Sequence, residues 1–172
     1  KTYRIDLLVD QGAVFELKAV DELMDEHRAQ LLNYLLLTGC HHGKLINFRP
    51  EKIEHEFVNT SLTHADRAAF EINDTAWDNS TATAQRVRQI SEEFLRDWGT
   101  ALELRLYVDA LTHFFGGNDR VLRDITVFNG DRKVGIQKVR MVDPESVFKI
   151  TALQHDAERY EAHIRKFLQH TQ

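Results

Sequence analysis

The sequence predicts an α/β fold, and three observations lead to this prediction. Residues 3–9 and 13–19 are apolar, rich in strand formers and separated by a short polar loop. A segment with helical spacing follows them and ends at Thr38. A strand pair followed by a helix is predicted a second time, between residues 135 and 169. Strands and helices in this order indicate a layered α/β domain, or two related ones.

The first two strands are predicted to pair as an antiparallel hairpin. A three-residue loop that ends in Gly12, with this glycine in the left-handed position, pairs Val9 with Ala13. In that register Asp6 falls opposite Glu16. Directly opposed side chains have Cβ atoms about 5 Å apart, and like charges there repel each other unless a cation lies between them. The register therefore predicts a site for a hard divalent ion.

Lys18 follows Glu16 by two residues, so both side chains project to one side of the strand. Phe15 and Leu17 then point to the other side, which is expected to face a core. A lysine beside a metal can orient or deprotonate an attacking water and stabilise charge that develops on a phosphate. The alternative is an ordinary solvated strand face, on which a glutamate and a lysine often alternate with apolar residues.

A helix is predicted from Asp21 or Asp25 to Thr38. Gln30 and Tyr34 are four residues apart and therefore share one face of it. A glutamine packed against a sheet is costly to bury without partners, so Gln30 suggests a polar cleft beneath the helix. The alternatives are a solvated or core-bonded glutamine and a core tyrosine with its hydroxyl at the edge.

The segment from Tyr3 to Phe48 resembles the PD-(D/E)XK nuclease superfamily, and more narrowly the bacterial group named for its GxxExxY motif. The resemblance rests on four strings, which are RIDLLV at 4–9, FELKAV at 15–20, QLLNYL at 30–35 and LINF at 45–48. It implies a restriction-endonuclease-like core with a mixed sheet. It also implies roles for individual residues: Asp6, Glu16 and Leu17 as ligands of Mg²⁺ or Mn²⁺, Lys18 as the catalytic lysine, and Gln30 with Tyr34 completing the catalytic site.

One departure from the family concerns its naming motif, which lies on a helix before the strand of Asp6. The sequence begins at Lys1, so the first copy is expected to lack this helix and its glutamate, with weaker metal binding and an exposed apolar face. A stretch with Gly99, Glu103 and Tyr107 is similar to a loosened form of the motif, with one extra residue in each interval.

The second half of the chain is similar to the first. A shift of 133 residues gives eight identities in the thirty pairs from 9 to 38, which suggests an internal duplication. The alternative is two unrelated segments with shared apolar patterning. The shift replaces the site residues in chain order by Val139, Lys149, Thr151, His163 and Phe167. Without carboxylates at the paired positions, this copy is predicted to be degenerate.

Composition limits the remaining possibilities. The chain of 172 residues, 42% of them hydrophobic, can bury one sizeable core or two small ones. The predicted domains are a nuclease-like core at 1–72, a linker at 73–83 and the degenerate copy at 84–172. The only cysteine, Cys40, excludes a disulfide framework and a thiolate zinc site and suits a reducing cytoplasm. No signal peptide or membrane span is predicted.

The charge distribution leaves two functions open. A net charge of −5 counts against tight nucleic-acid binding. Basic residues nevertheless gather between positions 86 and 140. They could form a face that guides a duplex toward the site, or they could be ordinary solvated side chains. They include Arg86, Arg88, Arg96, Arg120, Arg123, Arg132, Lys133, Lys138 and Arg140. The first function is a metal-dependent nuclease of the bacterial cytoplasm that acts on nucleic acid, with DNA expected and a homodimer allowed. The second is a non-catalytic nucleic-acid- or protein-binding module of nuclease ancestry.

Overall fold

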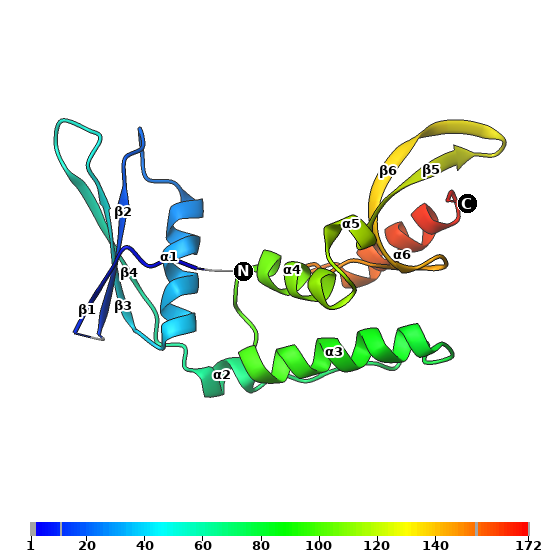
Figure 1. Ribbon diagram of the computed structural model, residues 1–172, viewed down its shortest axis with the longest axis horizontal. Coiled ribbons are helices and arrows are strands. Elements are labelled where there is room, and N and C mark those ends of the chain that lie inside the picture. Colours follow the sequence, from blue (N-terminus) through cyan, green and yellow to red (C-terminus); the bar gives the residue numbers. More distant parts are fainter. Residues whose placement is uncertain (1–2, 11, 154, 172) are drawn as a thin grey trace. The chain divides into compact units, whose positions relative to one another are not determined.

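The computed structural model describes residues 3–10, 12–153 and 155–171 and confirms the α/β class with a mixed sheet (Figure 1). The chain forms two compact units. Unit 1 comprises residues 1–73 and 93–103, and unit 2 comprises residues 74–92 and 104–172. The long helix α3 (Ala82–Trp98) contributes its first part to unit 2 and its last part to unit 1.

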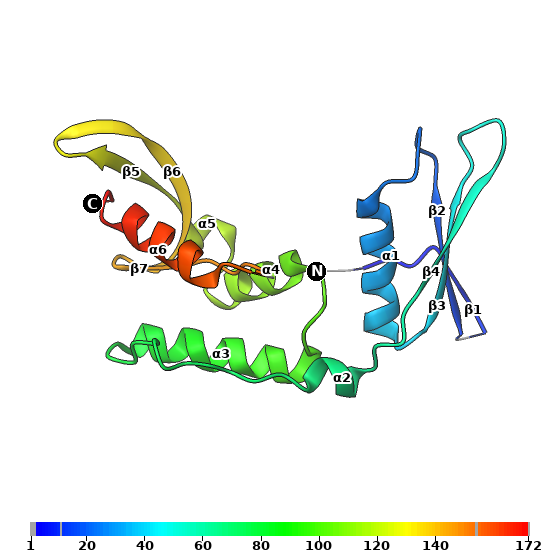
Figure 2. The same cartoon turned by 180° about the vertical axis from the view of Figure 1, so that it is seen from behind.

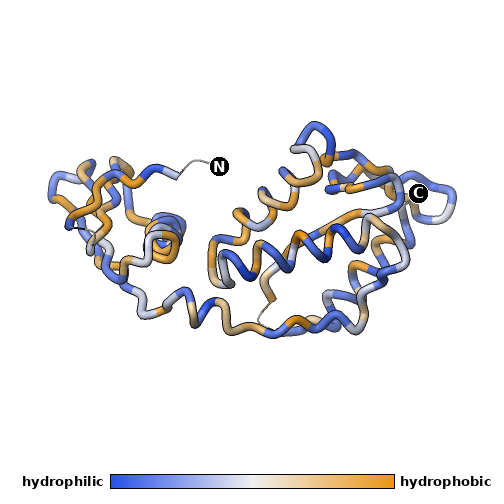
Figure 3. Tube along the Cα trace, turned by 60° about the horizontal axis from the view of Figure 1, so that its bottom comes forward, coloured by the Kyte–Doolittle hydropathy of each residue, from blue (hydrophilic) through white to orange (hydrophobic). Residues whose placement is uncertain are grey.

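The other elements follow in chain order. Those of unit 1 are β1 (Leu7–Val9), β2 (Ala13–Lys18), α1 (Asp25–Thr38), β3 (His42–Asn47), β4 (Glu54–Asn59) and α2 (His64–Ala68). Those of unit 2 are α4 (Leu104–Phe114), α5 (Asn118–Val121), β5 (Leu122–Asn129), β6 (Arg132–Asp143), β7 (Ser146–Phe148) and α6 (Ala157–Leu168). Hydrophobic and hydrophilic residues are interspersed along the helices of both units (Figure 3). No helix in the described ranges is long and apolar enough to cross a membrane.

The hairpin of β1 and β2 has the predicted register, since Val9 pairs with Ala13 and Leu7 pairs with Phe15. Its turn differs from the prediction. Asp10 takes the left-handed conformation with φ 50°, whereas Gly12 does not, so the assignment of that position to Gly12 is wrong. Aspartate tolerates this conformation because its short side chain can bond locally. The strand β1 is also shorter than the predicted segment, because its pairing begins at Leu7.

The mixed sheet of unit 1 has the order β1-β2-β3-β4, with β2 and β3 parallel and the other pairs antiparallel. The crossover between the parallel strands is α1, which packs its apolar side on the sheet, as parallel neighbours require. Leu31 and Leu35 of the helix and Leu45 of β3 are fully buried in this core. The arrangement is consistent with the predicted restriction-endonuclease-like core.

The buried side of β2 is opposite to the predicted one. Val14 is fully buried and Glu16 is 3% exposed, whereas Leu17 is 41% exposed. The prediction that Phe15 and Leu17 point into a core is therefore wrong. Glu16 can be buried because Oε1 of its carboxylate accepts two hydrogen bonds there, which offsets part of the cost of desolvation.

The helix α1 begins at Asp25 and ends at Thr38, within the predicted bounds. At its start the Met24 amide donates a 2.9 Å hydrogen bond to Nδ1 of His27. At its end Gly39 adopts φ 73°, the left-handed conformation in which glycine has no Cβ penalty. These local signals explain why this helix could be predicted from the sequence.

The segment 93–103 is joined to unit 1 by buried polar contacts. Arg67, 5% exposed, donates to the carbonyl of Leu36 at 3.0 Å and also to the carbonyl of Trp98. Asn33, 3% exposed, accepts a 3.1 Å hydrogen bond from the amide of Glu103. Unit 1 is therefore completed by residues far along the chain.

We expect Gly99→Ala to destabilise this junction strongly. Gly99 has φ +72°, and a Cβ there would lie 2.7 Å from Cβ of Arg67. Left-handed strain alone costs about 1–2 kcal/mol, and the clash adds to it. Gly130→Ala is the matched control, because Gly130 has φ +59° and no atom within 4 Å of its ideal Cβ. Urea unfolding should show a larger loss for Gly99→Ala. Equal losses of unfolding free energy in the two variants would show that the Arg67 side chain can move aside at no cost.

A second prediction concerns acid stability. Arg28 of α1 donates a 2.7 Å hydrogen bond to Glu56 of β4, and this bond holds the pKa of Glu56 below its ordinary value. A lowered carboxyl pKa stabilises the fold above the unfolded value of about 4.3, and this stabilisation is lost as the pH falls through the folded pKa. Glu56→Gln should therefore lose stability against wild type near neutrality and converge with it in acid.

The measurement is urea unfolding at several pH values. Glu51→Gln is the control, since this exposed glutamate lies in the loop between β3 and β4. A gap between wild type and Glu56→Gln that stays constant across the acid range would refute the linkage to this carboxylate.

Unit 2 contains a three-stranded antiparallel sheet in the order β5-β6-β7. Its most buried apolar side chains are Leu111 of α4 and Val121 of α5, at 1% and 0% exposure. The helix α6 follows the β6–β7 hairpin (Figure 2). None of the described residues of α6 is fully buried.

Candidate functional site

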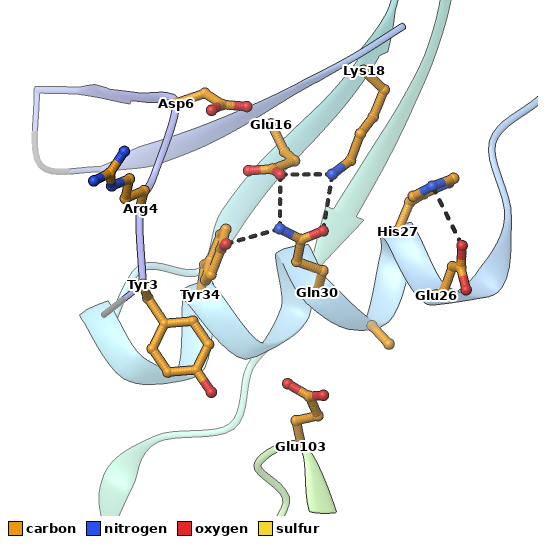
Figure 4. Close-up of a pocket in the computed structure, with 11 residues that line it drawn as sticks. Tyr3, Arg4, Asp6, Glu16, Lys18, Glu26, His27, Gln30, Tyr34 and Glu103 are labelled. Carbon is orange, nitrogen blue, oxygen red and sulfur yellow. Dashed lines mark hydrogen bonds and ion pairs between the residues drawn. The ribbon is translucent and has the colours of Figure 1, made fainter. Parts of the chain in front are cut away.

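A cavity of about 750 Å³ in unit 1 contains the five side chains that the sequence singles out as catalytic (Figure 4). They come from the segment before β1, from β2 and from α1. They are Asp6, Glu16, Lys18, Gln30 and Tyr34. The hairpin register and the helical spacing thus bring residues nearly thirty positions apart to one cavity. Leu17 does not line the cavity; its side chain is exposed.

Glu16 is the centre of the hydrogen-bond network. Its Oε1 accepts from Nζ of Lys18 at 2.8 Å and from Nε2 of Gln30 at 3.0 Å. Its Oε2 is buried and has no hydrogen-bond partner in the part of the chain that the structure describes. A buried carboxylate oxygen without a donor is unfavourable, because it loses its hydration without compensation. This oxygen is therefore the atom of the site that most needs a cation or a donor.

Gln30 connects the helix to the strand. Its Oε1 accepts from Nζ of Lys18 at 2.9 Å, and its Nε2 donates to Oη of Tyr34 at 2.8 Å as well as to Glu16. The amide thus uses both of its ends, one toward the lysine and one toward the acid. Gln30 thus lies in a polar cleft, as its sequence position suggested. The alternative for Tyr34, a core tyrosine with its hydroxyl at the edge, also describes it, because Tyr34 is 5% exposed and belongs to the core.

Asp6 lies at the mouth of the cavity, just before β1. Its Oδ2 accepts a 2.8 Å hydrogen bond from the backbone amide of Leu17. This bond ties the aspartate to β2 one residue beyond Glu16. The strand pairing itself begins at Leu7, so the predicted pairing of Asp6 with Glu16 is not part of the ladder. Figure 4 shows both carboxylates on the cavity side.

The strand end that carries Lys18 is fixed by Asn47 of β3, which is fully buried. The Asn47 side chain donates to the carbonyl of Val20 at 2.8 Å and accepts from the amide of Val20 at 3.0 Å. These two hydrogen bonds fix the conformation of the backbone just after Lys18. The sequence contained a signal for these bonds, an asparagine between the apolar residues Ile46 and Phe48, but its partner could not be predicted from spacing.

Sequence reasoning missed other residues of the cavity. Glu103 points into the cavity from the segment just before α4 (Figure 4). A hydrogen bond from its backbone amide to the side chain of Asn33 holds it there. The remaining lining residues are Tyr3, Arg4, Glu26, His27 and Ala29. The signal for Glu103 was present as the middle position of the loosened motif, but that motif predicted a role in the second half of the chain.

The residues present fit a hard divalent ion. Mg²⁺ is often held by one or two carboxylates and keeps several waters, so Glu16 with an unpartnered oxygen and a nearby exposed Asp6 provide a suitable donor set. A cluster of three or more His, Cys, Asp or Glu side chains is not found within the described ranges. Any further ligands would have to be water, backbone oxygen or substrate oxygen.

The five side chains that the resemblance in the sequence assigns to a divalent-metal nuclease site therefore line one cavity. Residues 1–60 match the family model of the PD-(D/E)XK nuclease superfamily. The matched segment carries all five catalytic candidates, and the match supports the superfamily and a nuclease-type function that acts on nucleic acid. Neither the curated proteins nor the solved structures gave a match to this chain. The narrower GxxExxY group and the internal duplication stay predictions.

Proposed function

We propose that this protein is a metal-dependent nuclease that hydrolyses phosphodiester bonds, with DNA as its substrate. The observation that carries the proposal is the state of Glu16, which is 3% exposed, bonded through Oε1 to Lys18 and Gln30, and unpartnered at Oε2. A purely structural glutamate would use both oxygens or lie in water. The superfamily match of residues 1–60 supports the same function.

Asp6 and Glu16, with the backbone carbonyl of Leu17, would hold Mg²⁺ or Mn²⁺. When bound, such an ion acts as a Lewis acid on a phosphoryl oxygen and lowers the pKa of a bound water. Hard cations prefer oxygen ligands, and the carboxylate residues Asp6 and Glu16 both line the cavity.

Lys18 provides the second part of the chemistry. Its ammonium donates to both Glu16 and Gln30, and these two hydrogen bonds set its position. The side chain of Lys18 is 15% exposed. Nζ can donate to a water or to a phosphate oxygen that enters the cavity, which orients the nucleophile and stabilises negative charge. Gln30 keeps the ammonium in this position, and Tyr34 keeps Gln30 in place.

One observation favours the second function, a non-catalytic binding module. The described residues do not bring three metal-ligating side chains together, so the site depends on water or substrate for its remaining ligands. In that function the Glu16–Lys18 pair would only stabilise unit 1.

The experiment that decides between the two is a cleavage assay of the full chain on linear and circular DNA and on RNA. We expect cleavage of DNA with Mg²⁺ or Mn²⁺ and none with EDTA. Binding of Mn²⁺ is measured in parallel by calorimetry. If neither nucleic acid is cleaved with either ion, the nuclease function is wrong and the binding module takes its place.

A further inference from the structure

Unit 2 contains a second cavity, of about 330 Å³, lined by the β6–β7 hairpin and α6. Four of its lining side chains are basic or can become so, and none is a carboxylate. They are Lys138, Arg140, Lys149 and His163. The other lining residues are mostly apolar and include Phe148 and Phe167. A cavity of this chemistry suits an anion with an apolar or aromatic portion.

The surrounding elements repeat those of the candidate site. In the β6–β7 hairpin Arg140 pairs with Phe148 and Met141 pairs with Val147. A shift of 133 residues converts these pairs into Leu7 with Phe15 and Leu8 with Val14, which are the pairs of the β1–β2 hairpin. The correspondence ends at the turn, where the β6–β7 ladder has an irregularity after Met141. A helix follows each hairpin.

The same shift aligns part of the lining of the first cavity with part of the lining of the second, although Thr151, the counterpart of Lys18, does not line the second cavity. The shift converts four of the catalytic candidates, in chain order Asp6, Glu16, Gln30 and Tyr34, into Val139, Lys149, His163 and Phe167. All four of the latter line the second cavity. Sequence alignment and cavity position are separate observations, so their agreement is independent support for a common origin of the two units.

The charge of the cavity is inverted in unit 2. Where the candidate site has the buried acid Glu16, the second cavity has Lys149, whose Nζ lies 5.2 Å from the ring centroid of Tyr160. Within the described part of the chain, Lys149 has no ion pair. Nε of Arg140 and Oη of Tyr160 are buried without a hydrogen-bond partner there. Of these groups, Arg140 and Lys149 line the cavity, and an anion bound there would supply the acceptor that they lack.

The two units also differ in total charge. Unit 2 has 13 Lys and Arg against 12 Asp and Glu, whereas unit 1 has 9 against 15, which together give the net charge of −5. An anionic polymer would therefore be repelled by unit 1 without metal and tolerated by unit 2. Unit 2 is the part of the chain in which metal-free affinity for phosphate is expected.

We propose that the second cavity binds a phosphate group of a nucleic acid strand, with Lys149 as the principal contact, and so anchors the substrate. The proposal rests on the nuclease function insofar as it takes nucleic acid as the ligand. Lys149, Lys138 and Arg140 supply charge-assisted hydrogen bonds to phosphate. The aromatic side chains of Phe148 and Phe167 offer an apolar surface on which a neighbouring base can stack.

The test is a binding titration of the full chain with a short fluorescein-labelled single strand of DNA in EDTA, where cleavage is stopped. Lys149→Gln should weaken binding about tenfold and lower the slope of log K against log salt by about 1. Lys133→Gln removes the same charge from β6 outside the cavity and should change binding less than about twofold. Melting temperatures confirm that each variant is folded.

Two further arms make the result specific. Lys138→Gln, a second cavity variant, should also weaken binding more than Lys133→Gln does. Binding is measured in EDTA and cleavage in Mg²⁺, so a failed cleavage assay and a failed anchor are separate results. Equal binding by wild type and Lys149→Gln overturns the proposal. A second result would also overturn it: inorganic phosphate or a mononucleotide binds in the cavity, but the affinity for the oligonucleotide is the same with and without Lys149.

Discussion

Glu16→Gln is expected to lower metal-dependent cleavage by more than about a hundredfold and to weaken Mn²⁺ binding. The change keeps the size and shape of the side chain but removes a full negative charge from the buried oxygen pair. Hard divalent ions prefer carboxylate to amide oxygen, so both the affinity for the metal and the rate of metal-dependent cleavage should fall. Oε1 of the glutamine can still accept from Lys18, which limits the structural effect.

The measurement combines a Mg²⁺ titration of cleavage, calorimetry with Mn²⁺ and thermal unfolding without metal. The unfolding free energy should change by less than about 1 kcal/mol, because the lost attraction to Lys18 and the relieved repulsion from Asp6 oppose each other. Glu51→Gln, the same chemical change at an exposed loop position, serves as the control and should behave as wild type does. A Glu16→Gln variant that cleaves at the wild-type rate would sink the site assignment.

Lys18→Met is expected to lower cleavage by about 10²–10³-fold while Mn²⁺ binding stays within about tenfold of wild type. The methionine keeps most of the side-chain length and removes the ammonium that lies 2.8 Å from Glu16 and 2.9 Å from Gln30. The loss of this donor should lower the cleavage rate more than the Mn²⁺ affinity, because the ammonium of Lys18 is not a ligand of the metal. The metal-free melting temperature should fall, since Glu16 loses its buried counter-charge.

Lys52→Met in the β3–β4 loop is the matched control, because it removes an exposed lysine of the same unit. The readouts are the cleavage rate at saturating metal and the Mn²⁺ affinity from calorimetry. If Lys18→Met loses Mn²⁺ affinity as severely as it loses cleavage, the lysine supports the metal site and has no separate role in the reaction.

Several features of unit 1 followed from local rules. The pairing of Val9 with Ala13 follows from loop length, and the helix from Asp25 to Thr38 follows from apolar spacing and Gly39. These rules depend only on neighbours along the chain, so the sequence is enough to apply them. They place the catalytic candidates on one hairpin and one face of the next helix, and these elements meet at one cavity.

The buried side of the sheet could not be predicted in the same way. The alternation of side chains along β2 shows that Glu16 and Leu17 face opposite sides, but it does not show which side a helix will cover. Apolar content favoured the side of Leu17. The structure covers the side of Glu16 instead, because Lys18 and Gln30 satisfy the carboxylate there.

The sequence by itself determined the strand register, the end of α1 at Thr38 and the residue types of the candidate site, whereas it left the start of α1 open between Asp21 and Asp25. Only the tertiary structure decided that segment 93–103 completes unit 1, that Glu103 enters the cavity, and that Oε2 of Glu16 is left without a partner among the described residues. The physical reason is the range of the interactions. Registers and helices are set by residues a few positions apart, whereas burial and hydrogen-bond satisfaction depend on groups that meet only when distant segments pack together.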